Sequence, residues 1–150
     1  MNIILLEATE VSSDHIVSLS GRRHKHVRDV LQSTEGDSLR VGVIDGATGT
    51  GLILSMNEVT LELRVELMDA PLPYHPTTLV LALPRPKMLR RTLRSCAEFG
   101  VRDIHIIQSY RVEKSYWQSP LLKPEKIREA LLAGLECSGD TRLPVVTLHR

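Results

Sequence analysis

The sequence predicts an α/β protein in two parts, a small β-barrel carrying one helix followed by a βαβαβ portion with a parallel sheet. Three observations support this fold class. Residues 1–72 contain short runs of strand-forming residues separated by turn residues. A proline-rich segment at 73–76 follows, and beyond it apolar strand-like runs alternate with segments of helical periodicity.

The first part, residues 1–72, is expected to contain five strands and a single helix. The helix is predicted at 22–32, with Val27, Val30 and Leu31 on its apolar side and basic residues outside. Five short strands with one helix are typical of a small barrel. The expected strands are 3–6, 16–19, 38–44, 51–56 and 60–67.

The second part, residues 77–150, is separated from the first by the linker at 73–76. Its first strand, 78–83, is a continuous apolar run, which is typical of strands in parallel sheets. The order strand, helix, strand, helix, strand then predicts a parallel sheet with crossover helices. The other expected elements are a helix from Pro86 to about Gly100, a strand at 103–108, a helix at 124–138 and a strand at 145–148.

Charge is distributed unevenly between the two parts. Residues 1–72 hold six Lys and Arg against eleven Asp and Glu, whereas residues 73–150 hold 13 against seven. The positive excess of the second part is concentrated before Lys126. A polyanion such as nucleic acid is therefore expected to be drawn mainly to the second part.

Basic residues occupy one face of the helix that begins at Pro86. They recur at i, i+3, i+4 and i+7, and no acidic residue offsets them before Glu98. Like charges at this spacing repel, and a cation in the first turn opposes the helix dipole by about 0.3–1 kcal/mol. We therefore favour contact with phosphate or RNA over a merely solvated face. The residues are Lys87, Arg90, Arg91 and Arg94, with Arg85 held extended beside them between two prolines.

A long connection at 109–123 interleaves basic and aromatic residues, which are Tyr110, Arg111, Lys114, Tyr116 and Trp117. Such loops can stack unpaired bases while neutralising phosphates. The alternative is that Trp117 and Tyr116 pin the loop to the core or to a partner subunit. The sequence does not decide between these two roles.

A second basic cluster, Arg22, Arg23 and Arg28, lies in the otherwise acidic first part. It either grips a phosphate backbone or forms an exposed helix face. His24 and His26 have a spacing that suits zinc, but no Cys or carboxylate cluster completes a site. Both histidines are therefore expected to be solvated, and no metal is expected.

Several other classes of protein are disfavoured. No run approaches the roughly 18 apolar residues of a membrane span, and the first residues lack signal-peptide features, so a cytoplasmic protein without membrane contact is expected. Cys96 and Cys137 lack C-x-x-C spacing and are expected to be inert thiols. The glycine-rich segment 46–51 precedes a strand-like run and lacks the lysine of a phosphate loop, which predicts a hairpin. Spacing reveals no catalytic set, so the catalytic residues are unknown.

A group of short motifs, in this order along the chain, resembles the ribosomal RNA small subunit methyltransferase E family. The resemblance covers essentially the whole chain. Each motif is weak alone, but their order and the change from barrel to α/β pattern are fairly specific. The motifs are His26-Val27 with Val30-Leu31, Gly36-Asp37, Leu83 to Lys87, Glu98 to Val101, Arg111, and Glu136 with Leu143-Pro144.

The resemblance implies methylation of N3 of a uridine in 16S ribosomal RNA with S-adenosylmethionine. It also implies a homodimer, an N-terminal PUA-like barrel and a C-terminal SPOUT domain with a trefoil knot. By this resemblance Arg22, Arg23 and Arg28 belong to an RNA-gripping barrel. Lys87, Arg90, Arg91, Arg94 and Arg111 face RNA near the active site.

The chain departs from the family pattern at three positions and at its end. Gln32 stands where the family often has arginine, Cys137 where it usually has glutamine, and Asp140 lies near a position that is often basic. The knot motifs that bind the cofactor do not appear before Arg150. We therefore expect a parent methyltransferase of which this chain supplies RNA binding and part of the catalytic domain, itself inactive and without bound cofactor. The alternatives are a non-catalytic RNA-binding module and, more remotely, a small-molecule α/β domain.

Overall fold

The computed structural model describes residues 1–73 and 75–150. Their contacts divide the chain into two compact units, Asn2–Pro71 and Leu72–Arg150, which we call the β unit and the α/β unit. The linker at 73–76 and the domain limits at 72 and 77 stay predictions, and Tyr74 of the linker lies outside the described residues. None of the described helices is long and apolar enough to cross a membrane.

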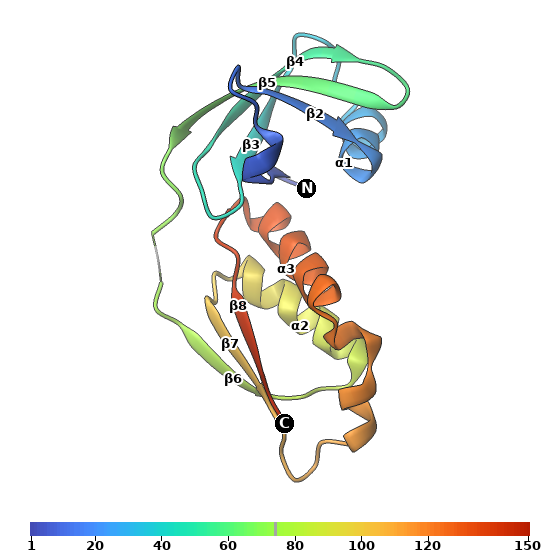
Figure 1. Cartoon of the computed structure of the whole chain (residues 1–150), viewed down its shortest axis with the longest axis vertical. Helices are drawn as coiled ribbons and strands as arrows, with labels where there is room; N and C mark the ends of the chain where they lie inside the picture. The colour runs from blue at the N-terminus through green and yellow to red at the C-terminus, as the bar shows by residue number, and fades with distance from the viewer. Residues whose placement is uncertain (74) are drawn as a thin grey trace. The chain divides into compact units, whose positions relative to one another are not determined.

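Five strands form the sheet of the β unit: β1 (Ile4–Leu6), β2 (Ile16–Ser20), β3 (Ser38–Val43), β4 (Thr48–Met56) and β5 (Thr60–Asp69). Their order is β1-β3-β4-β5-β2, with β1 parallel to β3 and the other pairs antiparallel (Figure 1). Within the described residues β1 and β2 are the two edges of the sheet. The predicted barrel is therefore a curled half-barrel that does not close.

Alternating residues build the core of the β unit. Along β5, Leu61, Leu63 and Val65 are buried while the residues between them are exposed, as expected of a strand with one covered face. The segment 46–51 is part of a hairpin, as predicted: the N–H of Val43 donates to the carbonyl of Ala47 over 2.9 Å, and β4 already begins at Thr48.

The helical segment of the β unit differs from its prediction. It consists of α1 (Gly21–Lys25) and the π-helical turn η2 (His26–Leu31), with a short turn η1 (Ala8–Glu10) elsewhere in the unit. Val27 is buried, but Val30 is 65% and Leu31 43% exposed. The wider π turn rotates these side chains away from the face that a regular α-helix would bury.

His24 takes the buried position instead. Its ring is 2% exposed, and its Nε2 lies 2.8 Å from the carbonyl oxygen of Asn57, at the turn between β4 and β5. The prediction that His24 is solvated is wrong, because a partner 33 residues away in the sequence satisfies the ring. His26, also expected to be solvated, is half-buried.

The α/β unit contains β6 (Thr78–Ala82), α2 (Pro86–Glu98), β7 (Asp103–Ile107), η3 (Lys114–Gln118), η4 (Pro120–Leu122), α3 (Pro124–Ser138) and β8 (Val145–His149). The strands form a parallel sheet in the order β6-β7-β8, which confirms the predicted βαβαβ order. Both long helices cover the same face of this sheet (Figure 1). The strand residues that face them, such as Ile104 and Ile106, are buried, whereas alternate residues of β6 and β8 are exposed.

Candidate nucleic-acid interface

The carboxyl ends of the three parallel strands bring several predicted site residues to one edge of the sheet. β6 leads into Arg85 and the first turn of α2, which carries Lys87. β7 leads into the connection with Arg111, and β8 ends at His149, next to Arg150. Open α/β sheets bind ligands at this edge, which we call the carboxyl edge.

The helix α2 begins and ends as its sequence predicts. Pro86 occupies the first helical position, where its missing N–H costs nothing. At the other end, the N–H of Val101 donates to the carbonyl of Cys96 (2.9 Å), and the N–H of Gly100 donates to the carbonyl of Ala97 (3.2 Å). Gly100 has a φ of 75°. This Schellman arrangement ends the helix at Glu98. The predicted apolar stripe is buried: Leu89, Leu93, Cys96 and Ala97.

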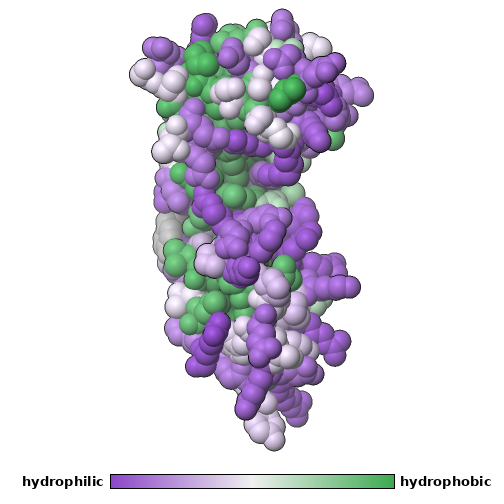
Figure 2. Space-filling model, turned by 45° about the vertical axis from the view of Figure 1, so that its right-hand side comes forward, coloured by the Kyte–Doolittle hydropathy of each residue, from purple (hydrophilic) through white to green (hydrophobic). Residues whose placement is uncertain are grey.

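The cationic face of α2 is fully formed on the opposite side. Figure 2 shows hydrophilic residues over much of the helical side of the α/β unit. The first turn contains no acidic residue. Among the described residues, no carboxylate forms an ion pair with Arg85, Lys87, Arg90 or Arg91. The basic residues Arg85, Lys87, Arg90, Arg91 and Arg94 are all exposed.

Within the basic face of α2, Arg94 makes a side-chain contact with α3. Its Nη2 lies 3.0 Å from the Sγ of Cys137 on α3. Cys137 is thus close to the basic face, at a position where the sequence departs from the family pattern. Cys96, by contrast, is buried, and its burial raises the pKa of its thiol, as expected for an inert side chain.

Trp117 has two partners within the α/β unit. Its indole Nε1 donates to the side-chain oxygen of Gln108, and the guanidinium carbon of Arg150 lies 5.5 Å from the centre of its ring. These contacts support the pinning role for Trp117. Arg111 and Lys114, in the same connection, are exposed.

The basic cluster of the β unit is largely occupied by neighbouring acids and carbonyls. Arg23 makes two hydrogen bonds to Glu10, at 2.5 and 2.9 Å, and a third to the carbonyl of Leu5 at 2.8 Å. Arg28 pairs with Asp29 at 2.6 Å. Arg22 is exposed on α1. RNA binding by these three arginines stays a prediction, and the contacts give Arg23 a structural role.

The Arg23–Glu10 pair predicts a pH dependence of stability for the β unit. The hydrogen bond from Arg23 holds the pKa of Glu10 below its usual value. The stabilisation is therefore present above the ordinary carboxyl range and is lost as pH falls through the lowered pKa. We expect Glu10→Gln to lower stability by about 1 kcal/mol at neutral pH. In acid, where Glu10 is protonated, the difference from the unmodified chain should vanish.

Urea unfolding followed through methyl NMR signals of the β unit measures this difference. Asp14→Asn, which alters another exposed carboxylate of the same unit, is the matched control. A stability difference for Glu10→Gln that is unchanged between neutral and acidic pH would contradict the assignment.

Asp140, the third departure from the family pattern, is buried. Its Oδ2 accepts a 2.6 Å hydrogen bond from Arg102, and both side chains are 5% exposed. The other oxygen accepts from the N–H groups of Thr141 (2.7 Å) and Arg142 (3.0 Å). Asp140 therefore stabilises the α/β unit and is not placed to contact RNA. Gln32, the remaining departure, is exposed and has a φ of 53°.

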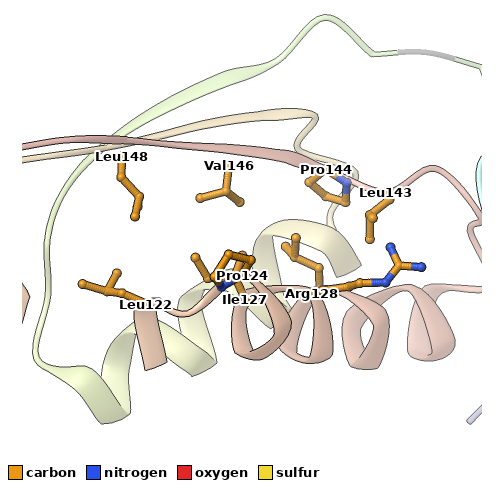
Figure 3. Close-up of a pocket in the computed structure, with 9 residues that line it drawn as sticks. Leu122, Pro124, Ile127, Arg128, Leu143, Pro144, Val146 and Leu148 are labelled. Carbon is orange, nitrogen blue, oxygen red and sulfur yellow. The ribbon is translucent and has the colours of Figure 1, made fainter. Parts of the chain in front are cut away.

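An apolar pocket of about 270 Å³ lies between α3 and β8 (Figure 3). Residues such as Ile127, Leu131 and Val146 line it, and Arg128 is its only charged lining residue. S-adenosylmethionine carries an ammonium and a sulfonium group, which this lining offers no carboxylate to meet. The pocket therefore does not fit that cofactor. The structure also brings together no three metal-binding side chains within the residues it describes.

Four functional or structural features could not be found, or were not singled out, from the sequence. Gln108 and Arg150 contact Trp117, and Arg102 pairs with Asp140 across 38 positions. Tyr110, which the sequence places among the aromatic residues of the connection without singling it out, is 101% exposed. Only Tyr110 had a local signal, because it neighbours Arg111 in a long loop. The other contacts depend on the folded arrangement.

Together these features define a β-rich unit joined to a parallel α/β unit with an exposed basic edge. A family model for an RNA methyltransferase domain matches residues 70–150. Because this match covers more than half of the chain, the chain belongs to the RNA methyltransferase domain family, and the resemblance predicted from the sequence is confirmed.

The comparisons with individual proteins agree with this family. The chain is 35% identical over 152 residues to ribosomal RNA small subunit methyltransferase E of Treponema pallidum (strain Nichols), covering 99% of this chain and 56% of the relative. The chain thus spans about half the length of that relative.

Two solved structures illustrate the likeness in fold. Ribosomal RNA small subunit methyltransferase E from Neisseria gonorrhoeae, bound to S-adenosyl methionine, has a TM-score of 0.76 at 19% identity, covering 100% of this chain and 62% of that one. A probable rRNA-methyltransferase from Porphyromonas gingivalis has a TM-score of 0.74 at 17% identity, covering 97% and 60%. At these identities the likeness shows a shared fold.

Proposed function

We propose that this chain is the RNA-holding portion of an S-adenosylmethionine-dependent methyltransferase that modifies N3 of a uridine in 16S ribosomal RNA. The observation that carries the proposal is the exposed basic face of α2, whose charges the described carboxylates do not neutralise. Family membership and the 35% identical relative support the reaction class. The 16S substrate and the N3 position rest on the sequence resemblance.

The two units have different parts in this proposal. The half-barrel is a PUA-like RNA-binding unit with Arg22 and Arg28 as candidate contacts, whereas the α/β unit is the first part of a SPOUT domain. The parent enzyme acts in the cytoplasm as a homodimer on ribosomal RNA or the small subunit. Because the pocket beside β8 does not fit the cofactor, we assign no catalytic residue and expect the chain alone to be inactive.

The chain's share of the reaction is to hold the substrate. N3 of a paired uridine lies inside the duplex, so the base must leave the stack before it can be modified. Unstacking costs a few kcal/mol, which phosphate contacts can offset. Arg85, Lys87, Arg90, Arg91 and Arg94 provide these contacts along α2, and Arg111 and Lys114 extend them into the connection.

Removing two charges from α2 tests the proposal. We expect Arg90→Gln/Arg91→Gln to weaken binding of a single-stranded RNA about 10-fold and to reduce the salt slope of log affinity by about 1.4. Fluorescence anisotropy with a labelled uridine-containing strand at several salt concentrations measures both quantities. The matched control is Arg40→Gln/Arg64→Gln, which removes the same charge from exposed positions of the five-stranded sheet.

The control separates a local interface from a general effect of net charge. If both double variants weaken binding equally, the affinity follows net charge and the assignment to α2 is wrong. If the α2 variant binds like the unmodified chain, the basic face does not hold RNA. The non-catalytic RNA-binding module remains the alternative, and an assay of methyl transfer by the parent protein distinguishes it.

A further inference from the structure

The connection after β7 begins with a tight turn that displays two exposed side chains. The N–H of Val112 donates to the carbonyl of Ser109 over 3.0 Å, which closes a β-turn with Tyr110 and Arg111 at its centre. Arg111 is exposed, and the ring of Tyr110 is 101% exposed. Burying a tyrosine ring is normally favourable, so folding alone does not explain this placement.

A side-chain clamp holds this turn in place. The Nε2 of Gln108 donates to the carbonyls of Ser109 (2.8 Å) and Val112 (3.1 Å), one at each end of the turn. The side-chain oxygen of Gln108 accepts the indole N–H of Trp117, and the backbone N–H of Gln108 donates to His149 on β8 over 3.0 Å. The turn is therefore fixed to the carboxyl edge of the sheet, and its tip is presented to solvent.

From this geometry we propose that Tyr110 stacks an unpaired RNA base while Arg111 contacts an adjacent phosphate. Gln108 and Trp117 are positioning residues that hold the turn. This inference rests on the proposed function and moves the stacking role from Trp117 to Tyr110. Trp117 has its N–H bonded to Gln108 and Arg150 above its ring, whereas both faces of the Tyr110 ring are open.

The chemistry of the turn favours a single-stranded segment over a duplex. An aromatic ring can stack a base only when that base has left its own stack, and every base offers a face for such stacking. The adjacent Arg111 neutralises the phosphate that must accompany the base. An exposed aromatic without a neighbouring cation would fit a protein partner equally well.

The test compares the affinities of variants of the full chain for a labelled uridine-containing single strand and for an RNA duplex. Tyr110→Ala is expected to weaken single-strand binding roughly 5- to 150-fold and to leave duplex binding unchanged. Tyr110→Phe keeps the ring and should bind like the unmodified chain. The control is Phe99→Ala, which removes an 84% exposed aromatic ring at the C-terminal end of α2. This substitution should not change the affinity for either RNA.

A double-mutant cycle tests the positioning role of Gln108. Gln108→Leu should weaken single-strand binding by itself and cause a smaller loss in a Tyr110→Ala background, where only the phosphate contact of Arg111 is left to displace. Equal losses in both backgrounds would show that Gln108 does not act through Tyr110. The urea midpoint followed by Trp117 fluorescence verifies that each variant is folded.

The outcomes separate this inference from the proposed function. If the unmodified chain binds RNA with steep salt dependence and Tyr110→Ala binds equally well, the stacking role is wrong while RNA binding stands. Equal losses for single strand and duplex also overturn stacking. Self-association lost in Tyr110→Ala, with RNA affinity unchanged, would assign the turn to a protein interface. If the unmodified chain binds neither RNA, the proposed function fails, and the inference with it.

Discussion

Asp140→Ala is expected to destabilise the α/β unit by about 3–5 kcal/mol. The substitution leaves the guanidinium of Arg102 buried without its anion, although Arg102 keeps a 2.7 Å hydrogen bond to the carbonyl of Arg142. The Nε of Arg102 already lacks a partner among the described residues. Two backbone N–H groups also lose their acceptor. The cost is high because an unpaired buried charge cannot be solvated.

Urea unfolding followed by tryptophan fluorescence measures this effect. Trp117 is the only tryptophan in the chain and lies in the α/β unit, so its emission reports on that unit. Replacing both partners, as Arg102→Leu/Asp140→Leu, removes the unpaired charge and should recover much of the loss. An Asp140→Ala midpoint equal to that of the unmodified chain would show that the buried pair is unimportant.

Gly134→Val is expected to destabilise the same unit by about 3 kcal/mol or more. A Cβ atom at Gly134 would lie 2.2 Å from the carbonyl oxygen of Arg94 and 2.8 Å from the Cβ of Ala97, both on α2. The oxygen belongs to a helical backbone, so it cannot move aside as a flexible side chain would. The two helices would have to separate and lose part of their packing.

A glycine with open space provides the contrast. Gly100 has a φ of 75°, and a Cβ atom added to it would meet no atom within 4 Å. Asparagine tolerates this backbone conformation, so Gly100→Asn is expected to cost about 1 kcal/mol or less. The urea midpoint from Trp117 fluorescence compares the two variants. Equal losses of stability in the two variants would show that close packing against α2 is not what requires a glycine at position 134.

The elements that could be predicted are those whose signals are local. For α2, Pro86 at the first turn, the stripe through Leu89 and Leu93 and the glycine at 100 all lie within the segment itself. The parallel strands were equally visible, because buried apolar runs alternate with helical periodicity. The two crossover helices predict that the sheet is parallel, whereas the order of its strands is seen only in the structure.

The features that could not be predicted depend on distant partners. The π turn after α1 accompanies the burial of His24 against Asn57, and nothing near His24 in the sequence reveals that carbonyl. The half-barrel is open because its two edge strands, β1 and β2, do not pair with each other among the described residues. Likewise Asp140 stands out in the sequence only as a departure from the family pattern, because its partner Arg102 lies 38 residues away.

The candidate interface also combines a part that the local sequence predicts with a part that depends on distant contacts. The basic face of α2 follows from helical spacing alone, whereas the display of Tyr110 depends on Gln108 and Trp117 meeting across the connection. The sequence left two roles open for Trp117. The contacts favour the pinning role, because both Gln108 and Arg150 engage its ring.

Amide hydrogen–deuterium exchange of the full chain, with and without a uridine-containing single-stranded RNA, tests the central claim most directly. The account predicts that RNA slows exchange in the first turns of α2 and at residues 108–118, where the basic and aromatic side chains gather at the carboxyl edge. Unchanged exchange in both segments, with protection confined to the five-stranded sheet, would contradict it.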